Sequence, residues 1–172
     1  MKEIIYNTRL YFPQQNFIFK LAHSFPLLIK LSFFRKIINK KLPNVKKSRI
    51  LPGFSAIIGS NIYAEDVYLN NTKFLDYADV KIGNGTVFSG NNTLITSTHD
   101  FSDFKVVRAR PIVIGENVWI THGCTILGGV TIGNNSVIGA GSVVTRSIPA
   151  NVFAAGNPCR VIKEIERRSL NG

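Results

Sequence analysis

His99 is the residue whose type and setting point most directly to chemistry. It lies in the run Thr-Ser-Thr-His-Asp-Phe-Ser-Asp-Phe, which begins at Thr96. A neutral imidazole can accept the proton of a hydroxyl group as that hydroxyl attacks an electrophile, because histidine titrates near neutral pH. Asp100 and Asp103 follow in the same run and could orient the imidazole or contact a substrate. The alternative is that both are solvated loop acids.

Metal-binding side chains are sparse in the sequence. His122 lies in Trp-Ile-Thr-His-Gly-Cys, and the two cysteines, Cys124 and Cys159, lack the spacing of metal ligands. A zinc site of three histidines would need one more histidine, because the repeat region holds only His99 and His122. The sequence therefore predicts no metal centre and no disulfide framework, as is usual in a reducing cytoplasm.

A six-residue repeat must position these side chains. Steps of six from Ile114 meet aliphatic residues each time, and glycine follows several of them. This period fits neither an α-helix nor a single alternating strand, but it is typical of short strands joined by tight turns around a solenoid. The aliphatic members are Ile114, Ile120, Ile126, Ile132, Ile138 and Val144.

The repeat is disturbed upstream of Ile114. Ile82, Phe88 and Leu94 keep the step, whereas Asn70 and Asp76 occupy positions where an aliphatic residue is expected. From Leu94 to Ile114 the chain is two residues longer than three hexads, so a loop must leave the coil near residues 99–111. His99 stands at the start of that loop.

Three blocks carry a resemblance to a known family. They begin at Pro111 (Pro-Ile-Val-Ile-Gly-Glu-Asn-Val-Trp-Ile), at Val130 (Val-Thr-Ile-Gly-Asn-Asn-Ser-Val-Ile-Gly-Ala-Gly-Ser-Val-Val-Thr) and at Ala155 (Ala-Gly-Asn-Pro-Cys-Arg-Val-Ile). Residues 55–165 resemble the hexapeptide-repeat acyltransferase superfamily, and sugar and polysaccharide O-acetyltransferases most. The resemblance implies an all-β solenoid that is a left-handed parallel β-helix, a homotrimer with sites between subunits, acetyl-CoA as acyl donor, and His99 as the catalytic base.

The same resemblance assigns binding residues. Along the acetyl-CoA groove it places Trp119, His122, Ala140, Gly141, Thr145, Arg146, Asn157, Arg160 and Lys163; around the saccharide acceptor it places Asn70, Asn71 and Asp76, with Asp100 and Asp103 as further candidates. The alternatives are coil packing for Trp119 and Ala140, an outward turn for His122, a solvated helix face for the last two basic residues, and structural turns for the asparagines.

Positive charge is concentrated in the first fifty residues. Residues 1–50 hold eleven Lys/Arg and one acid, whereas residues 51–172 hold ten Lys/Arg and nine acids. The nearly neutral body argues against nucleic-acid binding. We expect a basic, aromatic-rich helical extension at 1–50, the β-helix at 51–159, and a C-terminal helix and tail at 160–172.

The basic extension sets the expected location. The stretch Phe17 to Phe34 has the length of a membrane span, but it is interrupted by Lys20, His23, Pro26 and Lys30. It fits either a helical cap on the coil or an interfacial helix at an anionic bilayer. The expected location is therefore the cytoplasm, with peripheral contact at the cytoplasmic face of the membrane as one arrangement.

The expected function is transfer of an acetyl group to a sugar hydroxyl, on a bacterial surface polysaccharide or its lipid-linked precursor. An alternative enzyme would acetylate a xenobiotic or the amine of an amino sugar. A different alternative is a non-catalytic β-helix used for binding or assembly, which would not require His99 and its loop.

Overall fold

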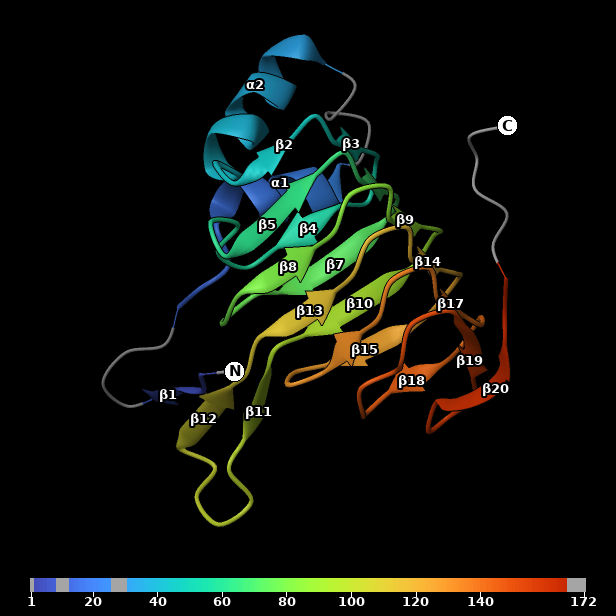
Figure 1. Cartoon of the computed structure of the whole chain (residues 1–172). Helices are drawn as coiled ribbons and strands as arrows, with labels where there is room; N and C mark the ends of the chain where they lie inside the picture. The colour runs from blue at the N-terminus through green and yellow to red at the C-terminus, as the bar shows by residue number, and fades with distance from the viewer. Residues whose placement is uncertain (1, 9–12, 26–30, 167–172) are drawn as a thin grey trace.

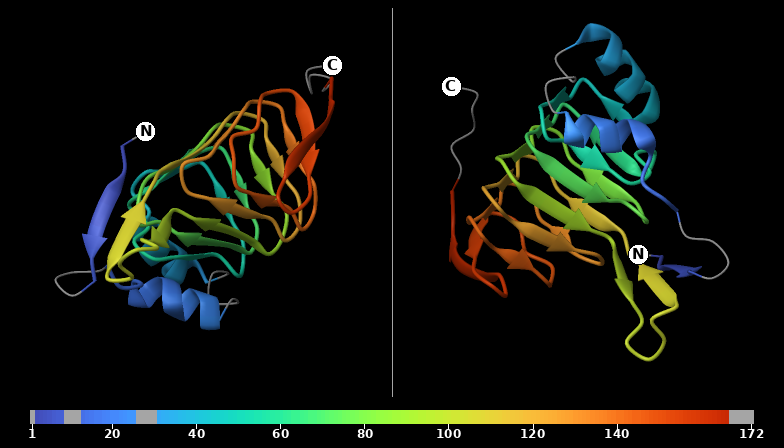
Figure 2. Two further views of the ribbon diagram at one scale, coloured as in Figure 1. Left: turned by 90° about the horizontal axis from the view of Figure 1, so that it is seen from below. Right: turned by 180° about the vertical axis from the view of Figure 1, so that it is seen from behind.

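The centre of the molecule is a parallel β-solenoid of about six coils, left-handed in sense. The computed structural model describes residues 2–8, 13–25 and 31–166. Each full coil contributes one short strand to each of three sheets, so the solenoid is nearly triangular in cross-section (Figure 1; Figure 2, left). We call the sheets the first, second and third faces, in the order in which the chain visits them.

On each face, the corresponding strands of successive coils pair in parallel and in register. The first face holds β2 (Val45–Lys46), β5 (Ile62–Glu65), β8 (Val80–Ile82), β13 (Ile112–Ile114) and β16 (Thr131–Ile132). The second holds β3 (Arg49–Ile50), β6 (Tyr68–Leu69), β9 (Val87–Phe88), β14 (Trp119–Ile120), β17 (Val137–Ile138), β19 (Val152–Ala155) and β20 (Arg160–Glu164). The third holds β4 (Ser55–Ala56), β7 (Thr72–Leu75), β10 (Asn92–Ile95), β15 (Thr125–Leu127) and β18 (Val143–Val144).

The corners between faces depend on left-handed backbone conformations. At the second corner, between the second and third faces, each successive coil places one residue at positive φ, where glycine and asparagine are favoured. Those residues are Gly53, Asn71, Asn91, Gly123, Gly141 and Gly156. The first corner, between the first and second faces, has a similar column. The third corner lies between the third and first faces.

The six-residue repeat forms the interior as predicted. All six aliphatic residues from Ile114 to Val144 are at most 2% exposed. Upstream, the frame differs from the predicted one, because Leu69 and Phe74 enter the core in place of Asn70 and Asp76. The chain keeps three hexads between Ala64 and Ile82 but lengthens the corner after β7, and Asp76 lies in that corner.

The N-terminal end of the solenoid is covered by helices. They are α1 (Phe17–Ser24) and α2 (Ser32–Lys41), and Figure 1 shows both over the first coil. Phe19 of α1 continues a column of core aromatics, with ring centroids 5.9 Å from Phe54, which is in turn 5.5 Å from Phe74. The first coil begins at Val45, earlier than the boundary predicted at residue 51. Neither helix is long or apolar enough to cross a membrane, within the ranges described.

The opposite end is covered by a strand, and the predicted C-terminal helix is wrong for the described residues. Arg160–Glu164 form β20, which runs antiparallel to β19. The unpaired edge of β19 offers hydrogen bonds that a strand can satisfy and a helix cannot. The charged side chains that suggested a solvated helix face fit an exposed edge strand equally well. Residues 167–172 lie outside the described residues.

The predicted loop is an antiparallel hairpin that leaves the solenoid at the third corner. Its strands are β11 (Ser97–His99) and β12 (Val106–Ala109), and β1 (Ile4–Asn7) pairs with the outer edge of β12. The three strands form a small separate sheet beside the coil, with the hairpin tip projecting away from it (Figure 1; Figure 2, right).

Candidate functional site

His99 is exposed at the end of β11, and its protonation pattern is set by the hairpin. Its Nδ1 lies 2.6 Å from the carbonyl oxygen of Phe104. A carbonyl oxygen can only accept, so Nδ1 carries the proton and donates it. In the neutral ring Nε2 then holds the free lone pair. A base with an open Nε2 is what proton abstraction from a hydroxyl requires.

The two acids near His99 make turn contacts in the hairpin. Asp100 accepts hydrogen bonds from Ser102, whose backbone N–H lies 2.8 Å away, and from Nε of Arg108 at 2.6 Å. The bonds from Ser102 and the Arg108 guanidinium hold the pKa of Asp100 far below its usual range. Asp103 accepts from the backbone N–H of Lys105. The group that orients the imidazole is therefore the carbonyl of Phe104, which sequence patterns do not reveal.

A ladder of polar side chains runs along the second corner. Nδ2 of Asn71 donates to Oδ1 of Asn91 in the next coil, and Nδ2 of Asn91 lies 3.1 Å from Nε2 of His122. Because that amide nitrogen can only donate, Nε2 of His122 accepts. Asn91 was missed by sequence reasoning. Its signal was a second Asn-Asn doublet, Asn91–Asn92, in which Asn91 takes the place of Asn71 in the preceding coil.

Small residues continue the second corner beyond His122. Ala140 and Gly141 are exposed, and the N–H of Gly141 donates to the carbonyl of His122. A Cβ added to Gly123 or Gly141 would meet no atom within 4 Å, so this stretch of the corner is open. Asn157 follows at the same corner after β19. The structure thus brings together five of the predicted residues: Asn71, His122, Ala140, Gly141 and Asn157.

Other residues predicted to bind acetyl-CoA lie beside this corner or away from it. Trp119, on the second face, is 43% exposed and donates from Nε1 to Oγ of Ser89 at 3.0 Å. Arg160 and Lys163 are exposed on β20 at the edge of the same face. Thr145 and Arg146 follow β18 and therefore lie toward the third corner.

Asp76 has a structural role that overturns its predicted contact with an acceptor. Its side chain is 0% exposed, and its carboxylate accepts from the backbone N–H groups of Ile57, Ile58 and Gly59 at 2.8, 3.0 and 2.7 Å. Three donors satisfy the buried carboxylate, and none of it reaches the surface. Asn70 is half-buried in the turn before β7, and its carbonyl accepts from Thr72.

His99 and the second corner stand at opposite ends of the third face. Strands on that face begin at the second corner and end at the third, where the hairpin leaves. Four residues of β10 span roughly 13 Å at about 3.3 Å each. Within one chain, His99 and the open second corner are therefore far apart.

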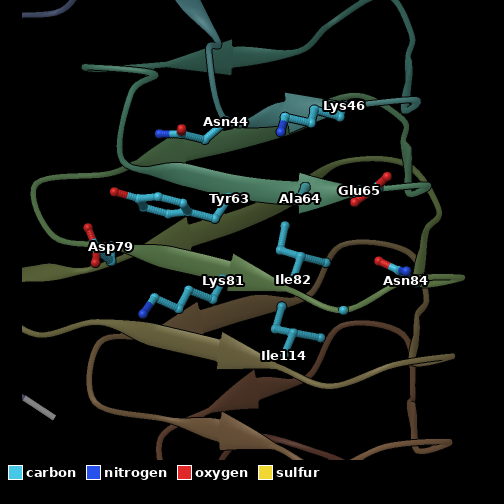
Figure 3. A pocket seen from close by; sticks show the side chains of 11 residues that line it. Asn44, Lys46, Tyr63, Ala64, Glu65, Asp79, Lys81, Ile82, Asn84 and Ile114 are labelled. Carbon is cyan, nitrogen blue, oxygen red and sulfur yellow. The ribbon is translucent and has the colours of Figure 1, made fainter.

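A hollow of about 610 Å³ lies elsewhere, on the outer side of the first face (Figure 3). Tyr63, Glu65 and Lys81 are among its lining residues, and Nζ of Lys81 lies 5.9 Å from the centroid of the Tyr63 ring. None of the predicted site residues lines it. In the part of the chain that the structure describes, no three His, Cys, Asp or Glu side chains are grouped to hold a metal ion.

The repeat region of the chain matches a known protein family. A profile of the bacterial transferase hexapeptide family (six repeats) matches residues 111–146. Galactoside O-acetyltransferase of Escherichia coli (strain K12) is 47% identical over 116 residues, which cover 64% of this chain and 57% of that protein. Three curated relatives are spanned over only 55–64% of their own length.

Solved structures share the architecture over most of the chain. The maltose O-acetyltransferase from Clostridium difficile 630 has a TM-score of 0.71 at 33% identity, covering 87% of this chain and 83% of that one. A hexapeptide-repeat acetyltransferase from Vibrio cholerae in complex with acetyl-CoA has a TM-score of 0.76 at 27% identity, covering 87% and 88%. With this coil and these relatives, the chain belongs to the hexapeptide-repeat acetyltransferase family.

Proposed function

We propose that this protein transfers the acetyl group of acetyl-CoA to a saccharide hydroxyl, with His99 as general base. Membership of the family supports the reaction class, and a structural neighbour was solved with acetyl-CoA bound. The observation that carries the role of His99 is its Nδ1 contact with the Phe104 carbonyl, which leaves Nε2 free to accept a proton.

The proposed reaction is a direct attack within a ternary complex. Nε2 of His99 takes the proton of the acceptor hydroxyl as its oxygen adds to the thioester carbonyl. A backbone N–H of a facing coil donates to the oxyanion of the tetrahedral intermediate. The C–S bond then breaks, the ester is released, and the imidazolium returns its proton to the thiolate of CoA.

The second corner is the proposed donor groove. Ala140 and Gly141 let the pantetheine arm lie close to the backbone, since neither presents a large side chain there. His122 and Trp119 flank the arm, while Arg160 and Lys163 provide cations for the nucleotide phosphates.

A homotrimer completes the proposed site. The base and the open corner lie at opposite ends of the third face in one chain, so a neighbouring copy must bring its corner to the hairpin. Phe101 and Phe104 at the hairpin tip are 91% and 72% exposed, which is consistent with an unfilled contact in the single chain.

The acceptor we propose is a surface polysaccharide or its lipid-linked precursor, met at the cytoplasmic face of the membrane. Four apolar side chains of the N-terminal helical region are more than half exposed: Phe17, Phe25, Leu31 and Phe33. Lysines accompany them on α1 and α2. Aromatic side chains beside lysines favour the surface of an anionic bilayer.

Release of CoA tests the reaction. The wild-type protein and His99→Ala are assayed with acetyl-CoA against galactosides, maltose, amino sugars and polysaccharide fragments. We expect turnover with a hydroxyl acceptor and a fall of about a hundredfold or more in His99→Ala, because general-base catalysis contributes about 10²–10⁴-fold. Lys105→Gln, at an exposed position of the same hairpin with no predicted site role, is the matched control. Near-normal turnover in folded, trimeric His99→Ala would refute the base. A requirement for an amine acceptor would replace O- by N-acetylation.

A further inference from the structure

The N-terminal strand β1 is held against the hairpin that carries His99. Pairing joins Ile4 to Ala109 and Asn7 to Val106, across about a hundred residues of sequence. β12 is the middle strand of the three, with β1 on one edge and β11 on the other. The position of His99 on β11 therefore depends on a strand outside the repeat.

An ion-pair network crosses one side of this small sheet. Oε1 of Glu3 lies 2.7 Å from Nε of Arg110, and its Oε2 lies 3.3 Å from Nη1 of Arg108. Nε of Arg108 lies 2.6 Å from Oδ2 of Asp100, the residue after His99. The network thus joins the residue before β1 and the residue after β11 through Arg108 of β12, and it ends beside His99.

A second contact joins β1 to the solenoid itself. Tyr6 and His99 both pair with Val107, from opposite edges of β12, so the three residues form one row across the sheet. The hydroxyl of Tyr6 donates to the backbone carbonyl of Tyr77 at 2.6 Å, and the two rings meet edge to face with centroids 6.1 Å apart. Val107 is 1% exposed and Tyr77 is 8% exposed. The Tyr6 end of the row is therefore packed on the third corner, whereas His99 at the other end is exposed.

We propose that β1 is a positioning strand for the proposed catalytic hairpin, with Tyr6 and Glu3 as its positioning residues. Tyr6 sets the distance of the row from the third corner, and Glu3 fixes the twist of the hairpin through Arg108 and Arg110. The proposal rests on the proposed role of His99. Neither residue touches the imidazole, so their effect is on its placement and not on proton transfer itself.

Tyr6→Phe and Glu3→Gln test the proposal in the full chain. Each removes polar contacts without adding bulk. We expect kcat to fall roughly tenfold, because a displacement of about 1 Å can cost about a hundredfold in rate. The KM for acetyl-CoA should stay within about twofold, since the proposed donor groove is at the second corner. Amide hydrogens of β11 and β12 should exchange faster, while those of the coil core should not.

Glu65→Gln is the matched control. Glu65 forms an exposed ion pair with Lys47 at 3.0 Å on the coil, so its loss should change neither kcat nor hairpin exchange. The double variant Glu3→Gln/Arg110→Gln is a further readout. If the two residues share one contact, their effects are not additive, and the kcat of the double variant should be no lower than that of the poorer single variant.

The outcomes separate this proposal from the proposed function. If His99→Ala is inactive but Tyr6→Phe and Glu3→Gln keep normal kcat, the positioning role is overturned and the base stands. Faster hairpin exchange with unchanged kcat would also overturn it. If His99→Ala remains active, the base is refuted, and the exchange data still report whether β1 fixes the hairpin.

Discussion

At the residue scale, hydrogen bonds within the hairpin orient the imidazole of His99 and hold the neighbouring carboxylate of Asp100. His99 was identified by its place where the six-residue repeat is interrupted, but its orienting partner is a backbone carbonyl five residues later. The adjacent carboxylate of Asp100 is directed to Ser102 and Arg108 instead. Side-chain types therefore predicted which residue could act as a base, and only the structure gave the tautomer.

Asp76→Asn should destabilise the fold. The substitution keeps the size but replaces one carboxylate oxygen by an NH₂ group, which cannot accept from the backbone of Ile57–Gly59. One buried N–H loses its acceptor, and such a loss costs about 1–3 kcal/mol. Denaturant unfolding measures the change. Asp79→Asn, three residues along the same corner and half-buried, should change stability little; equal losses for the two variants would contradict the role given to Asp76.

The carboxyl of Asp100 should titrate well below the usual aspartate range. Its pKa is lowered by hydrogen bonds from Ser102 and Arg108, so its contacts stabilise the hairpin above the unfolded-state pKa of about 3.9 and are lost only as pH falls through the lower folded-state value. Carbon NMR of the side-chain carboxyl measures this midpoint. Arg108→Gln should raise it, and a midpoint near 3.9 in the wild type would show that the network does not form in solution.

At the element scale, the coils are held together by a column of core side chains. Phe54, Phe74 and Phe88 follow one another down the interior, with 6.4 Å between the last two centroids. Phe74 could not be assigned to the core from the hexad frame, because the frame places Asp76 there. A longer corner, closed by the Asp76 carboxylate, restores the register, and such a compensation between backbone and side chain is invisible to a fixed period.

Phe74→Ala should remove a large part of the stability. The side chain is 0% exposed between two aromatic neighbours, and truncating a buried Phe costs about 3–5 kcal/mol. The midpoint of chemical unfolding measures the loss. Phe33→Ala supplies the comparison, because Phe33 is 73% exposed and its truncation should cost little. Similar losses at the two positions would contradict the assigned core.

At the scale of the whole molecule, the repeat was predictable, whereas the strands β1 and β20 near its two ends were not. Six-residue spacing is a local property, and it indicated the solenoid and the loop correctly. β1 pairs with a strand about a hundred residues away, and β20 covers an edge that exists only once the coil is built. The N-terminal helices were expected from composition, but which aromatics face the coil and which face solvent depends on the packing of Phe19 over Phe54.

Replacing Phe17, Phe25 and Phe33 together by serine should weaken binding to vesicles of anionic lipid. The change removes exposed apolar area while leaving the lysines, so binding should fall several-fold in sedimentation and become more sensitive to salt. Activity on a soluble acceptor should not change. Phe101→Ser is the control, since that side chain is even more exposed, at 91%, but lies on the hairpin. Unchanged sedimentation of the triple variant would exclude membrane contact through these residues.

The pairing of β1 with β12 also has a consequence for the order in which the chain is made. Residues 4–7 leave the ribosome long before residues 106–109 exist to receive them. At about 5–20 residues per second, that interval is roughly 5–20 s. Coils contact only their neighbours and can stack during this time, so β1 must wait for a partner strand that is made about a hundred residues later.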